Sequence, residues 1–344
     1  MTLLDWHRPL WSARFGARSF PASLMLAGAR GSGVREFGLA VAQALLCARE
    51  TADGLPCGEC DDCRWSASGR HPDLLRLGEF PASETEAEDT PESVDVQESE
   101  EVKGARKDKR LIPVEAIRGL IGFLQVTANR ERARVAVLSP ADWMNAAAAN
   151  SLLKILEEPP AHAHLVLVTH APARLPATIR SRCVRIQVPD PSAAEAQDWL
   201  KARGIAHPEL VLAQTGGSPL AVADLSETYW DARSRLLPAL ARDTSGRRSA
   251  ELLALAERME VADCLRLMQT WCADLAGVRA GAAARFHPDY GSVLERIAAA
   301  VSIRRLMRYE TRLRTSRRWL DHPLNPKSAV EDLLLGYLAI FEEH

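Results

Sequence analysis

Four of the seven cysteines in this 344-residue sequence lie close together along the chain. Cys47, Cys57, Cys60 and Cys63 follow the spacing C-x9-C-x2-C-x2-C. The short spacings let neighbouring thiolates reach one ion through a tight loop, and four thiolates complete the tetrahedral shell of a structural zinc ion. Free thiols and an iron–sulfur cluster are the alternatives, although no other feature indicates redox chemistry. We therefore predict a structural Zn²⁺ site that leaves no coordination position open for catalysis.

A glycine-rich turn near the start of the chain resembles a phosphate loop that has lost its chemistry. A working loop reads G-x-x-x-x-G-K-[ST], and residues 28–35 here read Gly-Ala-Arg-Gly-Ser-Gly-Val-Arg. Gly28, Gly31 and Gly33 keep the tight turn. Val34 stands where a lysine would neutralise phosphates, and Arg35 stands where a hydroxyl would bind magnesium. Residual nucleotide binding through the backbone stays open.

The second half of such a site is also altered. In working sites an acidic pair ends a core strand and holds magnesium, but the apolar run 135–138 is followed here by Ser139 and Pro140. Two losses in one site remove the ligands of both the metal and the terminal phosphate. We expect no ATP bound by this chain and no intrinsic ATPase activity. The alternative is an autonomous ATPase with an atypical loop, in which Arg35 replaces the lysine.

Two further motifs carry a resemblance to the AAA+ clamp-loader family of DNA polymerase III. Residues 150–160 read Asn-Ser-Leu-Leu-Lys-Ile-Leu-Glu-Glu-Pro-Pro, similar to the family's N-A-L-L-K-x-L-E-E-P-P, and residues 181–183 match its S-R-C motif. In that family the arginine enters the ATP site of the adjacent subunit, where a planar guanidinium stabilises charge on the transferred phosphoryl group. The resemblance implies that Arg182 is an arginine finger in trans. The alternative is that Arg182 only forms a surface salt bridge. Arg180, two residues earlier, is the control residue to test beside it.

The resemblance also implies partners and a mechanism. Thr169 stands at the family's sensor-1 position, and Leu220 replaces the arginine of a sensor-2 segment. The chain would be a rigid, non-hydrolysing subunit of the polymerase III holoenzyme. Its expected partners are the clamp-loader ATPase subunit (tau/gamma), the delta subunit, the sliding clamp and, through the complex, primed DNA. Arg132 and its basic neighbours could contact template phosphates, but a solvated turn explains them equally well.

The elements that must position these residues alternate between strand and helix. Apolar runs of strand length lie at 22–27, 74–77, 135–138, 165–169 and 184–188, with helical patterns at 114–124 and 145–157. This alternation predicts an α/β fold with a mostly parallel sheet. With the resemblance, we expect a RecA-like AAA+ domain, a small helical lid and an all-α collar domain for oligomerisation. Their expected bounds are 1–190, 191–228 and 229–344, with the zinc insertion at 47–63 inside the first.

A strongly acidic stretch interrupts the first domain. Residues 79–102 contain ten acidic residues and no basic one, and five basic residues follow by position 110. Such a composition cannot bury enough apolar surface to fold, so we predict a disordered insertion at 79–110 and assign it no role.

Composition limits the remaining possibilities. Hydrophobic residues make up 47% and charged residues 26%, which is typical of a globular protein. The formal net charge of −2 disfavours a free-standing DNA-binding protein, including a zinc-dependent nucleic-acid module. The N-terminus lacks the pattern of a signal peptide, so we expect a cytoplasmic protein. The remaining cysteines, Cys183, Cys264 and Cys272, are predicted to be buried small apolar residues.

Overall fold

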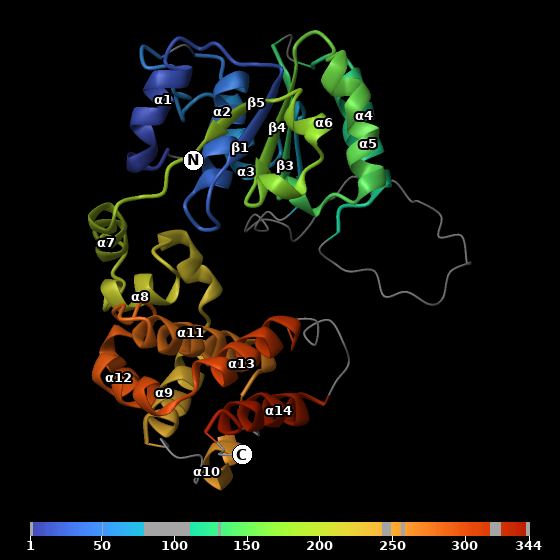
Figure 1. Cartoon of the computed structure of the whole chain (residues 1–344). Coiled ribbons are helices and arrows are strands. Elements are labelled where there is room, and N and C mark those ends of the chain that lie inside the picture. Colours follow the sequence, from blue (N-terminus) through green and yellow to red (C-terminus); the bar gives the residue numbers. More distant parts are fainter. Residues whose placement is uncertain are drawn as a thin grey trace. The chain divides into compact units, whose positions relative to one another are not determined.

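The computed structural model describes residues 3–49, 51–78, 111–129, 132–242, 249–255, 259–316 and 325–341. The chain divides into two compact units, Met1–Asp190 and Pro191–His344, and each is described by itself (Figure 1). The acidic insertion predicted at 79–110 lies outside the described residues.

The first unit is built on a five-stranded parallel sheet. The strands are β1 (Ser23–Ala27), β2 (Leu74–Gly78), β3 (Arg134–Ser139), β4 (Ala163–Thr169) and β5 (Val184–Gln187). Their order across the sheet is β2-β3-β4-β1-β5. Because all the pairs are parallel, the carboxyl ends of the strands meet at one edge, where ligands of open α/β sheets usually bind. The residues that follow β1, β3 and β4, which include the glycine-rich turn, lie along this edge.

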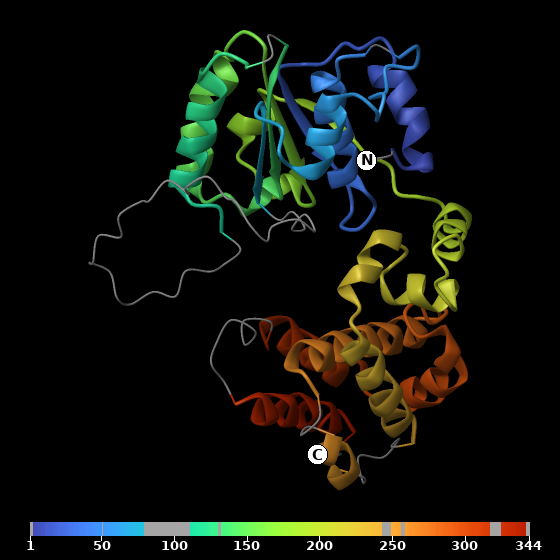
Figure 2. The same ribbon diagram turned by 180° about the vertical axis from the view of Figure 1, so that it is seen from behind.

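Helices cover both faces of the sheet. They are α1 (Arg8–Phe15), α2 (Val34–Leu46), α3 (Asp61–Ser68), α4 (Val114–Gln125), α5 (Ala146–Glu157) and the single turn α6 (Ala177–Arg180). Alternate side chains of each strand enter different cores. On β1, Leu24 and Leu26 pack with α1 and α2, whereas Met25 packs with α4 and α5. The two helical layers are seen on either side of the sheet in Figure 1 and from behind in Figure 2.

The predicted α/β class with a parallel sheet is confirmed. Each predicted strand lies within two residues of an observed one. The central strands β1, β3 and β4 are buried on both faces and read as apolar runs, whereas the edge strands β2 and β5 are partly exposed. The predicted helix at 145–157 corresponds to α5, which begins after Asn145. The Asn145 side chain accepts a hydrogen bond from the Ala148 N–H at 2.8 Å, and Pro159 follows the last turn. Helices α1, α3 and α6 were not predicted.

The second unit is helical throughout its described part. Its helices are α7 (Ala193–Lys201), α8 (Pro208–Gln214), α9 (Glu227–Arg242), α10 (Ser249–Ala254), α11 (Val261–Arg279), α12 (Gly291–Ala300), α13 (Ile303–Ser316) and α14 (Pro326–Leu338). This agrees with the expected helical C-terminal region. A single apolar core runs from α7 to the residues after α14. The expected boundary between lid and collar at 228/229 stays a prediction.

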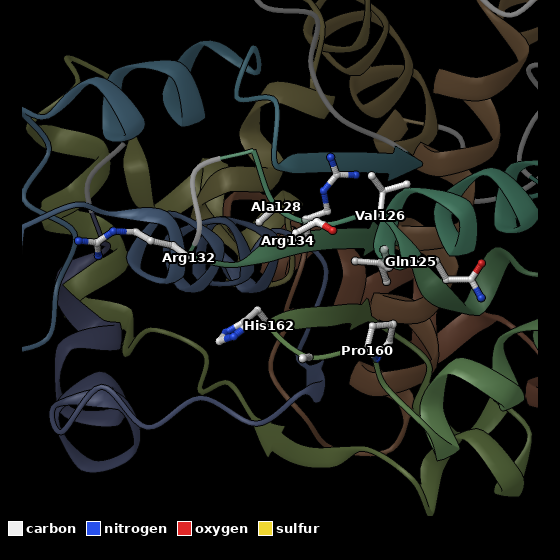
Figure 3. Close-up of a pocket in the computed structure, with 10 residues that line it drawn as sticks. Gln125, Val126, Ala128, Arg132, Arg134, Pro160 and His162 are labelled. Atoms are coloured by element: carbon white, nitrogen blue, oxygen red, sulfur yellow. The ribbon is translucent and has the colours of Figure 1, made fainter.

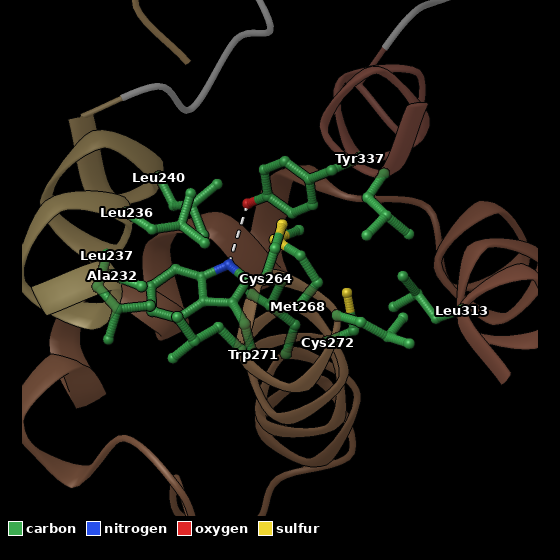
Figure 4. Close-up of a cluster of buried hydrophobic side chains, with 14 of the residues drawn as sticks. Ala232, Leu236, Leu237, Leu240, Cys264, Met268, Trp271, Cys272, Leu313 and Tyr337 are labelled. Carbon is green, nitrogen blue, oxygen red and sulfur yellow. Dashed lines mark hydrogen bonds between the residues drawn. The ribbon is translucent and has the colours of Figure 1, made fainter. Parts of the chain in front are cut away.

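Helix α11 forms the centre of that core (Figure 4). The Trp271 indole is fully buried and donates a hydrogen bond to the Tyr337 hydroxyl of α14 at 3.1 Å. Cys264 and Cys272 line the same helix and are fully buried, as predicted. The prediction that Cys183 is buried was only partly right, because this side chain at the sheet edge is half-buried. No described helix has the length and apolar character needed to cross a membrane.

Candidate metal centre and nucleotide-site remnant

The four cysteines of the predicted zinc site come together in space. All four Sγ atoms lie within 4.8 Å of one another. Cys47 Sγ is 3.9 Å from Cys60 Sγ, and Cys57 Sγ is 3.9 Å from Cys63 Sγ. A tetrahedral zinc ion with Zn–S bonds of about 2.3 Å would separate its sulfur ligands by about 3.8 Å. The donor set and its spacing therefore fit Zn²⁺, whereas no pair is close enough for a disulfide.

Local backbone structure explains how a short loop gathers the four thiols. Cys47 is the C-cap of α2, Cys60 is the N-cap of α3, and Cys63 lies in the first turn of α3. Gly58 has a positive φ of 76°, which lets the chain turn sharply between Cys57 and Cys60. The backbone N–H of Cys57 points at Cys47 Sγ, and that of Cys60 points at Cys57 Sγ, both at 3.4 Å. These contacts would stabilise thiolate charge.

Two side chains outside the cysteine loop hold it in place, and sequence reasoning missed this role for both. Gln43 is buried in α2 and donates to the Cys63 carbonyl at 3.0 Å. Arg132, just before β3, donates to the carbonyls of Cys47 at 2.9 Å and Ala48 at 3.0 Å. The cysteine loop is therefore tied by hydrogen bonds to α2 and to the segment that leads into β3.

The four thiols do not share one electrostatic environment. Burial raises the pKa of the Cys47 and Cys63 thiols. Burial also acts to raise the pKa of Cys57, but the backbone N–H groups of Cys60 and Glu59 outweigh it and lower that pKa to about 6. A divalent cation would favour the thiolate at every position.

The glycine-rich turn keeps the backbone shape of a phosphate loop. Gly31 and Gly33 have φ values of 78° and 95°, and α2 begins at the next residue. The side chains at the two altered positions are engaged elsewhere. Val34 is buried in the core, and Arg35 forms an ion pair with Glu36 at 2.8 Å.

The N-terminal segment packs directly against this turn. The Trp6 indole N–H donates to the Ser32 carbonyl at 3.0 Å. A Cβ on Gly33 would overlap Leu4 Cδ1 and lie 2.9 Å from His7 Cε1. His7 is fully buried, and burial lowers its pKa to about 4 against a weaker opposing effect of Glu36. Apolar contacts and a neutral imidazole thus surround the turn on this side.

The ends of β3 and β4 are joined by a carboxylate that the sequence reasoning did not single out. Asp142 Oδ1 accepts from the Thr169 hydroxyl at 2.7 Å and from the His170 N–H at 3.1 Å. The His170 ring Nδ1 lies 3.1 Å from the Gly28 carbonyl. Thr169 therefore bonds inside the fold, and the turn after β1 is linked to the ends of β3 and β4. The sequence offered one signal for this role of Asp142, which is that it is an acidic residue three positions beyond Ser139.

Arg182 lies just after α6, near the end of α5. Its Nη2 is 2.6 Å and its Nε 2.9 Å from Glu157 Oε1, and its Nη1 donates to the Thr178 carbonyl at 3.1 Å. The Arg182 side chain is 36% exposed and that of Glu157 is 51% exposed. The guanidinium is thus oriented yet reachable from solvent. Arg180 is also exposed, whereas Leu220 lies in the second unit.

A cavity of about 300 Å³ opens at the amino edge of the sheet (Figure 3). Arg132, Arg134 and His162 line it, together with Val126 and Pro160. Arg134 is buried and bonds to the Phe123 carbonyl at 2.7 Å, and Arg132 is tied to the cysteine loop. Both guanidinium groups therefore serve the fold, and Arg130 lies outside the described residues.

Comparison with known proteins gives a family. A family model described as DNA polymerase III, delta subunit matches residues 10–192, and a model of the C-terminal part of that delta protein matches residues 227–337. The subunit delta′ of Yersinia pestis is 32% identical over 74% of this chain and 68% of its own length. The chain belongs to the DNA polymerase III delta′ family. The delta′ subunit of Escherichia coli is 29% identical over 89% of this chain and 86% of its own length.

The similarity to one further delta′ relative is stronger but shorter. The Pseudomonas aeruginosa delta′ subunit is 37% identical over 63% of this chain, and the match spans 60% of that protein. The matched delta′ region of residues 10–192 includes the four cysteines, the altered turn and Arg182.

Proposed function

We propose that the chain is the delta′ component of a bacterial clamp loader and does not hydrolyse ATP itself. Its delta′ relatives support the first part. The second part is supported by the side chains at the nucleotide-site remnant. Val34 is buried where a lysine would be needed, Ser139 and Pro140 provide no carboxylate, and Asp142 is already bonded to Thr169.

Arg182 is proposed to act as an arginine finger in the ATP site of a neighbouring ATPase subunit (tau/gamma). The observation that carries this role is the exposed guanidinium, which Glu157 and the Thr178 carbonyl orient at the edge of the first unit. A finger must be preorganised and yet able to reach another chain. An exposed ion pair is worth about 0.2–1 kcal/mol, so exchange of Glu157 for a phosphate would cost little.

In this mechanism the neighbouring subunit binds ATP, and Arg182 completes that site. Its charge would stabilise the oxygens of the transferred phosphoryl group. The complex, with the delta subunit, would open the sliding clamp and place it on primed DNA, and hydrolysis would then release the loader. The chain itself would act as a rigid partner.

The cysteine site is proposed to hold a structural zinc ion through Cys47, Cys57, Cys60 and Cys63. Zinc would supply a crosslink between the end of α2 and the start of α3, with no part in the reaction. Gln43 and Arg132 would transmit that rigidity to the sheet, because they bond to the carbonyls of Cys63 and Cys47.

The test is the ATPase activity of a reconstituted loader with ATPase subunit, delta, clamp and primed DNA. We expect Arg182→Ala to lower the rate by about 10³-fold at the affected site, diluted in the total by other intact sites. Arg180→Ala removes an equal charge two residues away and should leave the rate unchanged. Equal rates for wild type and Arg182→Ala would assign Arg182 a structural role only.

The isolated chain is the second control. Hydrolysis by the purified chain, lost on Arg35→Ala, would replace this proposal with an autonomous ATPase that uses an atypical loop.

A further inference from the structure

Helix α13 in the second unit carries a concentration of positive charge that the proposed function does not use. It contains five arginines and one acidic residue, Glu310, in a chain whose formal net charge is −2. At 3.6 residues per turn, Arg305, Arg308 and Arg312 fall within an arc of about 60°. This arc adjoins the buried stripe of α13 that contains Leu306.

The three arginines line a cavity between α13 and α14, which lie side by side in both views (Figures 1 and 2). The cavity has a volume of about 280 Å³, and Gly336, Ala339 and Ile340 form its other wall. Gly336 permits the close approach, since a Cβ there would lie 2.8 Å from the Tyr309 ring. The site is thus a cationic groove with a small apolar wall.

Charge compensation within the groove is incomplete. Arg312 forms an ion pair with Asp332 of α14. Glu310 pairs with Arg314 on another side of α13, at 2.6 Å. Among the described residues, Arg304, Arg305 and Arg308 have no ion-pair partner. Counting only the described part of the chain, Arg305 and Arg308 therefore give the cavity two guanidinium groups without an ion-pair partner.

We propose that this groove binds the phosphate groups of a single nucleic-acid strand. Arg305, Arg308 and Arg312, which line the groove, extend about 10 Å along the helix, which suits consecutive phosphates better than one small anion. Guanidinium groups donate bidentate hydrogen bonds to phosphate oxygens. Tyr309 also lines the cavity, but it is only 4% exposed and donates its hydroxyl to the Leu333 carbonyl at 2.6 Å, so we expect phosphate contacts to dominate and the binding to depend little on base sequence.

The test measures binding of a fluorescein-labelled oligothymidylate of about 20 nucleotides to the full chain, alone and in the reconstituted loader. Arg305→Ala/Arg308→Ala should weaken binding about tenfold at 50 mM salt. It should also reduce the slope of log affinity against log salt by about 1.4, since each single-strand phosphate contact contributes about 0.7. The matched control, Arg235→Ala/Arg279→Ala, removes two exposed charges outside the groove and should change neither quantity.

Several outcomes would overturn the proposal. Equal weakening by both double variants would indicate only nonspecific charge, and absence of oligonucleotide binding would remove the site. Equal binding of an oligoglutamate of similar charge would point to an acidic protein, and equal binding of ADP would point to free phosphate esters. Arg182→Ala leaves this groove intact, so loss of the finger role and loss of the groove role are separable.

Discussion

The contact between Arg182 and Glu157 makes a quantitative prediction about the proposed finger. Two of the Arg182 nitrogens lie within 2.9 Å of Glu157 Oε1, but both side chains are more than a third exposed. The pair is therefore worth about 0.2–1 kcal/mol, which corresponds to at most about a fivefold effect. A trans arginine contributes about 10³-fold, or about 4 kcal/mol, to the rate. If Arg182 is the finger, the stronger interaction, with the phosphoryl group, would therefore determine the position of the guanidinium in the assembled site.

Glu157→Gln should therefore change the ATPase rate of the reconstituted loader by no more than about fivefold, whereas Arg182→Ala removes most of the activity of the neighbouring site. Arg182→Lys keeps the charge but loses the planar fork, and should recover only part of the rate. The assay is steady-state ATP hydrolysis with clamp and primed DNA, with assembly checked by gel filtration. A loss of 100-fold or more with Glu157→Gln in an intact complex would refute the reasoning, because it would make the carboxylate itself essential.

Three further predictions concern the first unit. Gly33→Ala should destabilise it by about 2–4 kcal/mol from left-handed strain and overlap with Leu4, and Leu4→Ala should recover part of that loss in a double-mutant cycle. Additive losses would show that the N-terminal segment does not cover the turn. Cys63→Ser should abolish stoichiometric zinc and unfold the cysteine loop while the sheet still melts cooperatively; collapse of the whole unit would contradict this. Burial lowers the pKa of His7 in the folded state from its ordinary 6.5 to about 4. As the pH falls, the unfolded state therefore binds a proton at His7 before the folded state does. About 3 kcal/mol of stability should be lost between pH 6.5 and pH 4. His7→Phe should flatten that part of the pH–stability profile measured by urea unfolding, and an unchanged profile would exclude His7 as its source.

Local features of this fold were predictable from the sequence because their determinants are adjacent in the chain. The Asn145 cap and the prolines after Glu158 determine the limits of α5. The four cysteines lie within 17 consecutive residues, so their convergence needs only one tight loop. The strands were found because each is a short apolar run between turn residues.

Contacts between distant segments were not predictable in the same way. Arg132 meets the Cys47 carbonyl across 85 residues, and Asp142 meets Thr169 across 27. These pairings depend on the order of strands in the sheet, which periodicity does not reveal. The packing of Leu4 on Gly33 had no sequence signal either, because leucines before a short helix are ordinary.

An ATP-dependent subunit would combine two roles, since its own ATP site accepts an arginine finger and it donates a finger to a neighbour; we propose that this chain keeps only the second role. At the nucleotide-site remnant, polar groups are bonded internally: Thr169 to Asp142, His170 to the Gly28 carbonyl, and Trp6 to the Ser32 carbonyl. These internal bonds fit the proposal that the chain does not hydrolyse ATP itself. Arg182, the proposed finger, is exposed, and its ion pair with Glu157 holds it only weakly. A subunit that supplies an arginine finger to its neighbour, but has no working ATP site of its own to complete, would occupy one end of a row of subunits. There it could activate one neighbouring ATPase without being activated itself.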